Sequence, residues 1–365
     1  MLTEKQVEEI KEHLERAQNP VFFFDNDQDG LCSFLLLQRF IGRGKGVAIK
    51  SFPGLDGSYF KRAMELGADY IFILDKHAVE EEFFKEIEQV NIPVVWIDHH
   101  AVAWIDNREL LQEIPEFVFY YNPLLNEKES SEPVSALCYQ VTKKKEDLWL
   151  AVVGCISDKF VPDFYHEFRK DYPDLSVDYE GDLNVYSDGA FDIYYKSQIG
   201  KITMMMGFGL KDSVTNVVSM LKFLMKAKSP YEVLEERKGN QTIHRRFEEI
   251  NEKFERLIKK ATEVGRDCGE ILFFNYGGDM GMSTDLSNRI KYLFPEKVVV
   301  LGRVSGTNMT ISVRGKSVRE KVLKVIECFE NATGGGHEDA VGVKIKKEEW
   351  EEFKNKLTKL VGSKK

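Results

Sequence analysis

Apolar residues in the first part of the chain form short continuous runs that end at acidic residues. Pro20–Phe24 leads into Asp25, Tyr70–Leu74 leads into Asp75, and Pro93–Ile97 leads into Asp98. A continuous apolar run that ends abruptly at polar residues is typical of a parallel strand buried on both faces. The segments between these runs have helical spacing, so the pattern predicts helices over 3–17, 31–40 and 79–90.

Strands that alternate with helices predict βαβ units and a mostly parallel sheet, which is an α/β fold. A further apolar run, Leu148–Ile156, ends at Ser157-Asp158. Ligands of parallel sheets bind beyond the carboxyl ends of the strands. We therefore expect the acidic residues that follow these apolar runs to meet at one place in the folded chain.

The pattern changes after residue 160. Residues 161–228 predict a mostly helical extension of the first domain, and 242–264 predict a long charged amphipathic helix that Gly265 ends. A second, smaller α/β domain is expected after it, with strands at 270–274, 298–304, 309–314 and 341–345 and helices at 284–293, 317–331 and from 348. The predicted organisation is therefore a first domain over 1–240, a connecting helix over 241–266 and a second domain over 267–365.

Length and composition agree with this division. A chain of 365 residues exceeds the size at which a single hydrophobic core usually stops growing. No stretch approaches the ~20 consecutive apolar residues that a membrane-spanning helix needs, and the first residues form a charged helix without the apolar core of a signal peptide. The sequence predicts a cytoplasmic protein without membrane contact, and it leaves monomer and oligomer open.

The net charge of −9 argues against a surface coated for DNA binding. The charge is unevenly distributed, because residues 289–365 contain 17 Lys and Arg against 10 Asp and Glu, a net +7, which leaves −16 for the remainder. An acidic body with a basic end suits metal binding in one domain and phosphate binding in the other. Ordinary solvated surface charge is the alternative explanation.

The first candidate site is Asp25-Asn26-Asp27-Gln28-Asp29-Gly30. Three carboxylates at alternate positions after a buried strand repel one another unless cations neutralise them. The motif also resembles the start of an EF-hand loop, but the apolar Leu35-Leu36-Leu37 stands where that loop requires a bidentate Glu. A solvated acidic turn is the structural alternative.

The second candidate is Asp98-His99-His100. Carboxylates and an imidazole suit borderline-hard divalent ions, and folding should bring this motif to the other acidic residues. The combined set is Asp25, Asp27, Asp29, Asp75, His99 and Asp158. Two ions roughly 3.5–4 Å apart can activate a water and stabilise both oxygens of an in-line displacement at phosphorus.

The third candidate is Thr333-Gly334-Gly335-Gly336-His337. Three successive glycines let backbone amides approach a phosphate closely, and His337 can add a donor. Upstream, Arg314 supplies a planar fork of N–H donors suited to bidentate phosphate contact. A flexible glycine turn and a surface arginine are the structural alternatives.

These motifs, in this order over nearly the whole chain, resemble the DHH phosphoesterase superfamily with its DHHA1 domain, in particular RecJ-like proteins. The segment Ser131-Glu132-Pro133-Val134-Ser135 also resembles one found in RecJ-like members. The resemblance implies a DHH domain in the first part of the chain and a DHHA1 domain in the second. It further implies a Mn²⁺-dependent exonuclease that hydrolyses single-stranded DNA or RNA from an end, in replication, repair or RNA turnover.

The resemblance also implies residue roles. The site would hold two divalent ions, preferably Mn²⁺ with Mg²⁺ as the alternative. One ion would be bound by Asp25, Asp27 and Asp75. The other would be bound by Asp29, Asp75, His99 and Asp158, so that Asp75 bridges the two. Asp98 would orient the histidine pair, and His100 would face the scissile phosphate. Arg314, the amides of Gly334, Gly335 and Gly336, and His337 would bind a nucleotide phosphate.

Two departures from the family leave alternatives open. Asp75 is followed by Lys76-His77, where many members have Leu-Gly or a similar pair. The 161–228 segment has no counterpart in small oligonucleotide-degrading members and resembles the extensions of archaeal RecJ-like proteins. The alternatives are a phosphodiesterase for short oligonucleotides (a nano-RNase) or cyclic dinucleotides, and a replication or repair scaffold with little catalysis. A replication or repair protein is the expected protein partner.

Overall fold

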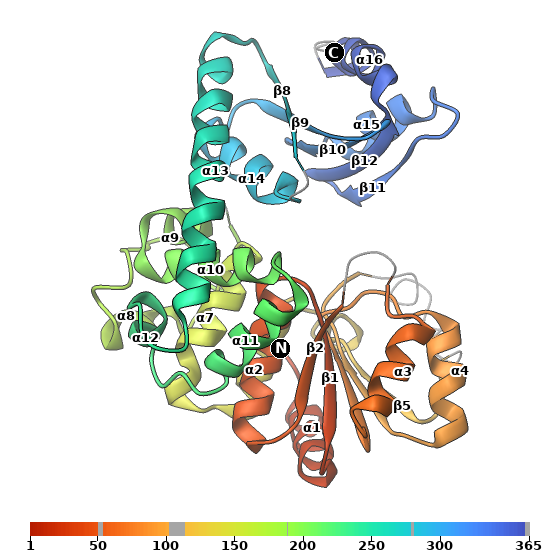
Figure 1. Cartoon of the computed structure of the whole chain (residues 1–365), viewed down its shortest axis with the longest axis vertical. Helices are drawn as coiled ribbons and strands as arrows, with labels where there is room; N and C mark the ends of the chain where they lie inside the picture. The colour runs from red at the N-terminus through yellow and green to blue at the C-terminus, as the bar shows by residue number, and fades with distance from the viewer. Residues whose placement is uncertain (50–53, 102–113, 188, 279–280, 362–365) are drawn as a thin grey trace. The chain divides into compact units, whose positions relative to one another are not determined.

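A computed structural model gives the fold of the chain and describes residues 1–49, 54–101, 114–187, 189–278 and 281–361 (Figure 1). The chain divides into two compact units, Met1–Arg246 and Phe247–Lys365. The division falls inside the helix α13 (Gln241–Asp267), which corresponds to the predicted connecting helix. The α/β fold with a mostly parallel sheet, a helical extension and a smaller α/β domain is confirmed.

The first unit contains a five-stranded sheet in the order β2-β1-β3-β4-β5, and every strand pair in it is parallel. The strands are β1 (Pro20–Asp25), β2 (Lys45–Ile49), β3 (Tyr70–Leu74), β4 (Val94–Ile97) and β5 (Val118–Tyr121). The helices around it are α1 (Glu4–Arg16), α2 (Gln28–Ile41), α3 (Gly57–Glu65) and α4 (Glu81–Val90). Strand order and strand sequence together place the carboxyl ends of β1, β3 and β4 side by side.

The aromatic residues of β1 explain why this strand is a continuous apolar run. Phe23 lies in a buried cluster with Phe83 of α4, and the two rings meet edge to face at 5.8 Å. Phe22 and Phe24 alternate to the other face, where both contact Phe34 of α2 at 5.5 and 5.2 Å. Both faces of the strand are therefore buried, as parallel sheets require.

Helices complete the first unit. They are α6 (Val134–Thr142), α7 (Leu148–Ser157), α8 (Tyr165–Asp171), α9 (Ala190–Lys196), α10 (Gln198–Leu210), α11 (Val214–Leu224) and α12 (Pro230–Leu234). A short antiparallel pair, β6 (Phe160–Val161) and β7 (Val185–Tyr186), interrupts them. The apolar run 148–156 is therefore a buried helix, and Asp158 follows a helix rather than a strand.

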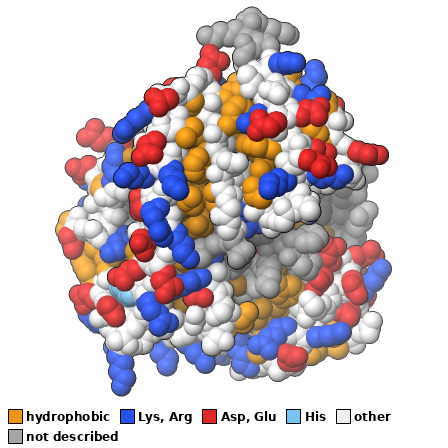
Figure 2. Space-filling model, turned by 45° about the horizontal axis from the view of Figure 1, so that its top comes forward, with side chains coloured by type: hydrophobic (Ala, Val, Ile, Leu, Met, Phe, Trp, Pro, Cys, Tyr) orange, Lys and Arg blue, Asp and Glu red, His pale blue; other side chains and the backbone are white. Residues whose placement is uncertain are grey.

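The described surface gives no sign of a membrane segment. None of the helices in the described ranges has the length and apolar character that a membrane crossing requires. On the face seen in Figure 2, Lys and Arg side chains are interspersed with Asp and Glu. A phosphate site on this face would therefore depend on individual basic side chains and not on a uniformly basic surface.

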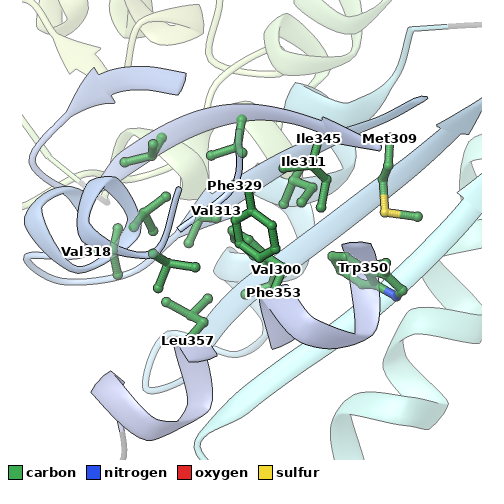
Figure 3. Packing of buried hydrophobic residues seen from close by; sticks show 14 residues of the cluster. Val300, Met309, Ile311, Val313, Val318, Phe329, Ile345, Trp350, Phe353 and Leu357 are labelled. Atoms are coloured by element: carbon green, nitrogen blue, oxygen red, sulfur yellow. The ribbon is translucent and has the colours of Figure 1, made fainter. Parts of the chain in front are cut away.

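The second unit contains a mixed sheet in the order β11-β12-β10-β9-β8. Its strands are β8 (Ile271–Gly277), β9 (Val298–Ser305), β10 (Asn308–Arg314), β11 (Thr333–His337) and β12 (Ala340–Lys346), and its helices are α14 (Ser283–Leu293), α15 (Arg319–Ile326) and α16 (Trp350–Val361). β8 and β9 are parallel, and the other pairs are antiparallel. Alternate residues of β10, including Ile311 and Val313, pack with Phe329, Trp350 and Phe353 into one core (Figure 3).

Two details of this unit differ from the sequence prediction. Gly265 does not end the long helix, which continues to Asp267. A Cβ atom at Gly265 would lie 2.5 Å from the Phe294 ring, so the glycine permits close packing instead of terminating the helix. The triple glycine forms strand β11 at the edge of the sheet, where a turn was expected.

Candidate metal centre

Three acidic residues stand at the carboxyl ends of neighbouring strands. Asp25 ends β1, Asp75 follows β3, and Asp98 follows β4. The amide of Asp75 donates to Ile97 O at 3.0 Å, and Asp75 has a φ of 58°. This left-handed conformation is uncommon outside glycine, and Asp and Asn tolerate it better than most residues. The chain thus turns sharply at the position where the family resemblance implies a bridging ligand.

The Asp-x-Asp-x-Asp-Gly segment forms the turn from β1 into α2. Asp27 is the N-cap of α2, and its Oδ1 accepts the Gly30 amide at 3.0 Å. A Cβ atom at Gly30 would lie 2.6 Å from Asp25 O, so this turn requires glycine. Asp29 lies in the first turn of the helix and is fully buried.

Asp29 is held by the segment that precedes α6. Its two carboxylate oxygens accept the backbone amides of Val134 at 2.7 Å and Ser135 at 2.9 Å. The N-terminus of a helix favours negative charge. The Ser131–Ser135 segment therefore has a physical role, which is to fix and stabilise a fully buried carboxylate of the site.

His99 has the strongest geometry for a metal ligand. Its Nε2 lies 3.3 Å from Asp75 Oδ1 and 3.6 Å from Asp158 Oδ2. Two ligand atoms that each lie about 2.1 Å from one ion are about 3.0–3.5 Å apart. Within the described residues this buried Nε2 has no hydrogen-bond partner. A cation would satisfy it. Among the described residues, two groups have ligand atoms within 4.8 Å of one another, Asp75-His99-His100 and Asp29-His99-Asp158, and both include His99, so the residues present fit a divalent ion.

The opposite nitrogen of His99 sets its tautomer. Nδ1 lies 3.3 Å from Ser131 O and 3.1 Å from the Tyr186 hydroxyl. A carbonyl only accepts, so Nδ1 carries a proton, and Nε2 is the nitrogen that faces the carboxylates and could bind an ion. Burial lowers the pKa of His99, but the charge of Asp158 outweighs burial and raises this pKa. Tyr186 comes from β7 in the helical extension. Sequence reasoning missed it, because a tyrosine in a polar stretch carries no motif.

Asp98 contacts only the second histidine of the pair among the described interactions. Its Oδ1 accepts from His100 Nδ1 at 2.7 Å. Burial lowers the pKa of His100, but the hydrogen bond and charge of Asp98 outweigh burial and raise this pKa to about 9. His100 therefore carries a proton at neutral pH in the metal-free chain. The His77 ring lies beside it, with ring centroids 5.5 Å apart.

Asp25 has a cationic partner within the chain. Lys76 Nζ lies 2.7 Å from Asp25 Oδ1, and the lysine side chain is almost completely buried. In the described part of the chain, the groups whose ligand atoms come close together are Asp75-His99-His100 and Asp29-His99-Asp158. Asp25 and Asp27 belong to neither group. The two groups share His99, whereas Asp25 is paired with lysine.

The remaining carboxylates have unusual acidity. Burial, followed by the charges of Asp25 and Asp158, raises the pKa of Asp27 to about 8. Burial and the charge of Asp29 raise the pKa of Asp158 to about 6, and burial raises the pKa of Asp75 well above its ordinary value. Neighbouring carboxylates repel one another when all of them are ionised, so some keep their protons in the metal-free chain. A bound cation stabilises the ionised forms, and those protons are released when it binds.

The affinity of the chain for Mn²⁺ should therefore rise with pH. Asp158, with a pKa of about 6, is about nine-tenths protonated at pH 5 and about one-tenth protonated at pH 7. Exchange of this one proton predicts about tenfold weaker Mn²⁺ binding at pH 5 than at pH 7. Calorimetric titration in buffers of different ionisation enthalpy should also detect released protons. Affinity that does not change over this range would contradict the ligand role of Asp158.

The second unit carries the predicted phosphate-binding residues. Arg314 is opposite Ala340, and Ala340 is opposite His337, so positions 314 and 337 lie in one row, two strand spacings or about 10 Å apart. Arg314 Nε donates to Asn288 Oδ1 of α14 at 2.8 Å, and Nη1 donates to Val313 O at 3.0 Å. The side chain of His337 lies outside what the structure describes.

The three glycines have different surroundings. At Gly336, with a φ of 145°, a Cβ atom would lie 2.2 Å from Ala340 O, and at Gly334 it would lie 2.9 Å from Gly342 O. At Gly335 a Cβ atom would meet no described atom within 4 Å. The fold therefore restricts the first and third glycines, whereas the space beside Gly335 is open to a ligand.

The comparisons agree with these features. Residues 269–363 match the family model of the DHHA1 domain. The fold is similar to that of Thermus thermophilus RecJ in complex with Mn²⁺, with a TM-score of 0.64 and 15% identity over 99% of this chain and 55% of that one. It is also similar to exonuclease RecJ bound to manganese, with a TM-score of 0.63 and 15% identity over 100% of this chain and 96% of that one.

A third similar structure is CDC45 from Entamoeba histolytica, with a TM-score of 0.51 and 10% identity over 98% of this chain and 99% of that one. No curated protein sequence matches the chain. The chain spans about half the length of the Thermus protein. The last part of the chain matches the DHHA1 domain, and the fold of the chain is similar to that of the RecJ structures. The predicted resemblance to the DHH phosphoesterase superfamily is confirmed, and the fold is RecJ-like.

Proposed function

We propose that the chain is a divalent-metal-dependent phosphodiesterase, with Mn²⁺ as the preferred ion, that hydrolyses single-stranded DNA or RNA from an end. The observation that carries the proposal is His99 Nε2, which is buried beside Asp75 and Asp158 and forms no hydrogen bond within the described part of the chain. The two RecJ structures of similar fold, both described with manganese, support it. We place this activity in the cytoplasm, in replication, repair or RNA turnover.

A divalent ion bound here would polarise a phosphodiester and promote attack by water. Asp29, His99 and Asp158 would hold it, with Asp29 oriented by the α6 amides and Asp75 beside the same nitrogen of His99. His100 donates its Nδ1 proton to Asp98, so its second N–H is available to a phosphate oxygen. Arg314 and the Gly335 backbone would bind a phosphate of the nucleic acid on the second unit.

The similarity to CDC45 supports a second candidate, a replication or repair scaffold with little catalysis. A scaffold does not need metal-competent side chains. Every predicted ligand position in this chain carries one, and His99 is oriented through Nδ1, so we favour the enzyme. Binding of a replication or repair protein in addition to catalysis is compatible with both candidates.

The test uses single strands of DNA and of RNA labelled at the 5′ or the 3′ end. With Mn²⁺ we expect a product ladder from one end. Chelator should abolish it and Ca²⁺ should support it poorly, because imidazole suits a transition metal better than calcium. Oligonucleotides of a few residues and a cyclic dinucleotide, tested in parallel, separate the nano-RNase alternative. Equal activity with calcium would contradict the metal assignment, and inactivity on every substrate would favour the scaffold.

A further inference from the structure

We infer that Lys76 replaces one of the two metal ions, so that this chain holds a single divalent ion, centred on His99, together with a built-in ammonium group beside Asp25. The inference rests on the proposed metal-dependent function. It states which positive charges neutralise the carboxylates of the site. It departs from the two-ion centre that the family resemblance implies.

The position of the ammonium group excludes an ion at Asp25. Lys76 Nζ lies 2.7 Å from Asp25 Oδ1. An ion bound to the same oxygen at about 2.1 Å would lie within about 4.8 Å of the ammonium. The lysine side chain is 5% exposed and the Asp25 side chain 26% exposed, so water screens the two positive charges only in part. Like charges this close in a partly buried site repel.

The backbone fixes the lysine in this place. The left-handed turn at Asp75 directs the chain from β3 into Lys76, and the indole Nε1 of Trp96 donates to Lys76 O at 2.8 Å. Trp96 is itself buried. Lysine is rarely this buried unless it is paired. Lys76 therefore differs from a surface lysine that could swing away when an ion arrives.

The other candidate ligands also indicate a single bound ion. Both clusters with metal-ligand spacing in the described residues contain His99. His99 offers one free nitrogen, since Nδ1 faces Ser131 O and Tyr186. His99 therefore serves one ion, together with Asp29 and Asp158 or with Asp75 and His100. A second ion would need the oxygens of Asp25, and Asp25 is paired with Lys76.

The ammonium also suits the chemistry. It has three N–H donors, and one of them bonds to Asp25. The others can reach a phosphate oxygen that an ion would otherwise bind, and lysine is an established point-charge ligand of phosphate. We therefore expect Mn²⁺ activation of the chain to follow simple one-site saturation.

The test counts ions on the full chain. Metal-free protein is equilibrated with Mn²⁺, and bound ion is measured by equilibrium dialysis and electron paramagnetic resonance. We expect about one tightly bound ion per wild-type chain, without spin coupling between ions. Asp25→Asn should still bind one ion, because its partner is Lys76. His99→Ala should lose the tight ion.

The decisive variant is Lys76→Met, which keeps the length of the side chain and removes the charge. It should bind a second Mn²⁺, visible as a spin-coupled pair. Lys76→Arg should remain at one ion, and the double variant Lys76→Met with Asp25→Asn should return to one. If Lys76→Met does not fold, the counts for wild type and Asp25→Asn still decide the question.

The outcomes separate this inference from the proposed function. Two coupled ions on the wild-type chain would overturn the inference and leave the metal-dependent function standing. No bound Mn²⁺ on the wild type would overturn the metal centre and the inference with it. A Lys76→Met chain that folds and stays at one ion would also overturn the role of Lys76.

Discussion

Replacing Asp75 with asparagine should reduce Mn²⁺-dependent hydrolysis by more than about 100-fold, because loss of outer partners of a metal ligand alone typically costs about 10–100-fold. Asp75 Oδ1 lies 3.3 Å from His99 Nε2 and 3.9 Å from His100 Nδ1, so it contacts both histidines of the site. Asparagine is the better substitution than alanine, because the φ of 58° at this position disfavours alanine.

The same variant should fold normally. Burial raises the pKa of Asp75, so its ionised form opposes folding in the metal-free chain. A neutral amide of the same shape removes that cost, and the melting temperature without metal should be unchanged or higher. Mn²⁺ should raise the melting temperature of the wild type. The rise should be much smaller for Asp75→Asn.

The matched control is Asp56→Asn, which changes the same group at the N-cap of α3, where asparagine caps a helix as well as aspartate does. It should retain activity and the Mn²⁺ effect on melting. Activity of Asp75→Asn above one-tenth of wild type would show that Asp75 is not a central ligand.

The central strands of the first sheet were predictable from sequence because they are buried on both faces. β3 is predicted residue for residue, and β1 and β4 differ by one residue at an end. The edge strands β2 and β5 were not predicted. β2 begins at Lys45-Gly46 and has only three successive apolar residues, Val47-Ala48-Ile49, so its apolar run is short. β5 is a continuous run of apolar and aromatic residues, Val118–Tyr121, so its pattern was present in the sequence and was overlooked.

The candidate site, too, could be predicted from the sequence only in part. Its acidic residues and histidines could be found because motifs at element ends converge in a parallel sheet. The contact of Tyr186 with His99 and the pairing of Lys76 with Asp25 could not, since they join residues 87 and 51 positions apart in the sequence. The strand at Gly334–Gly336 was also missed, because glycine has no side-chain pattern and pairing with β12 alone defines it.

The second large effect should come from Arg314→Ala, which we expect to raise KM for single-stranded nucleic acid by about 10- to 100-fold. Loss of a charge-assisted contact costs roughly 1.5–3 kcal/mol, which is about 10- to 150-fold in binding. Mn²⁺ affinity should not change, because Arg314 belongs to the second unit and the proposed ligands to the first. If the contact tightens in the transition state, kcat falls as well, so both constants are measured. His337→Ala should behave similarly.

Two companion variants separate binding from folding. Gly335→Ala adds one methyl group where no described atom lies within 4 Å, so the melting temperature should hold while KM rises. Lys324→Ala, at an exposed position on α15, removes the same charge as Arg314→Ala and should leave KM unchanged. Since Arg314 also bonds Asn288, the melting temperature of Arg314→Ala must be recorded with its kinetics.

A small activated phosphodiester provides the final comparison, since it has a single phosphate and cannot occupy a metal centre and a second phosphate site at once. The Arg314, His337 and Gly335 variants should hydrolyse it almost as well as the wild type does, whereas Asp75→Asn should not. If the Arg314 variant instead lost Mn²⁺ binding and kept its KM, the phosphate site would be misplaced. A Gly335→Ala chain with wild-type KM would leave the glycine strand with a structural role alone.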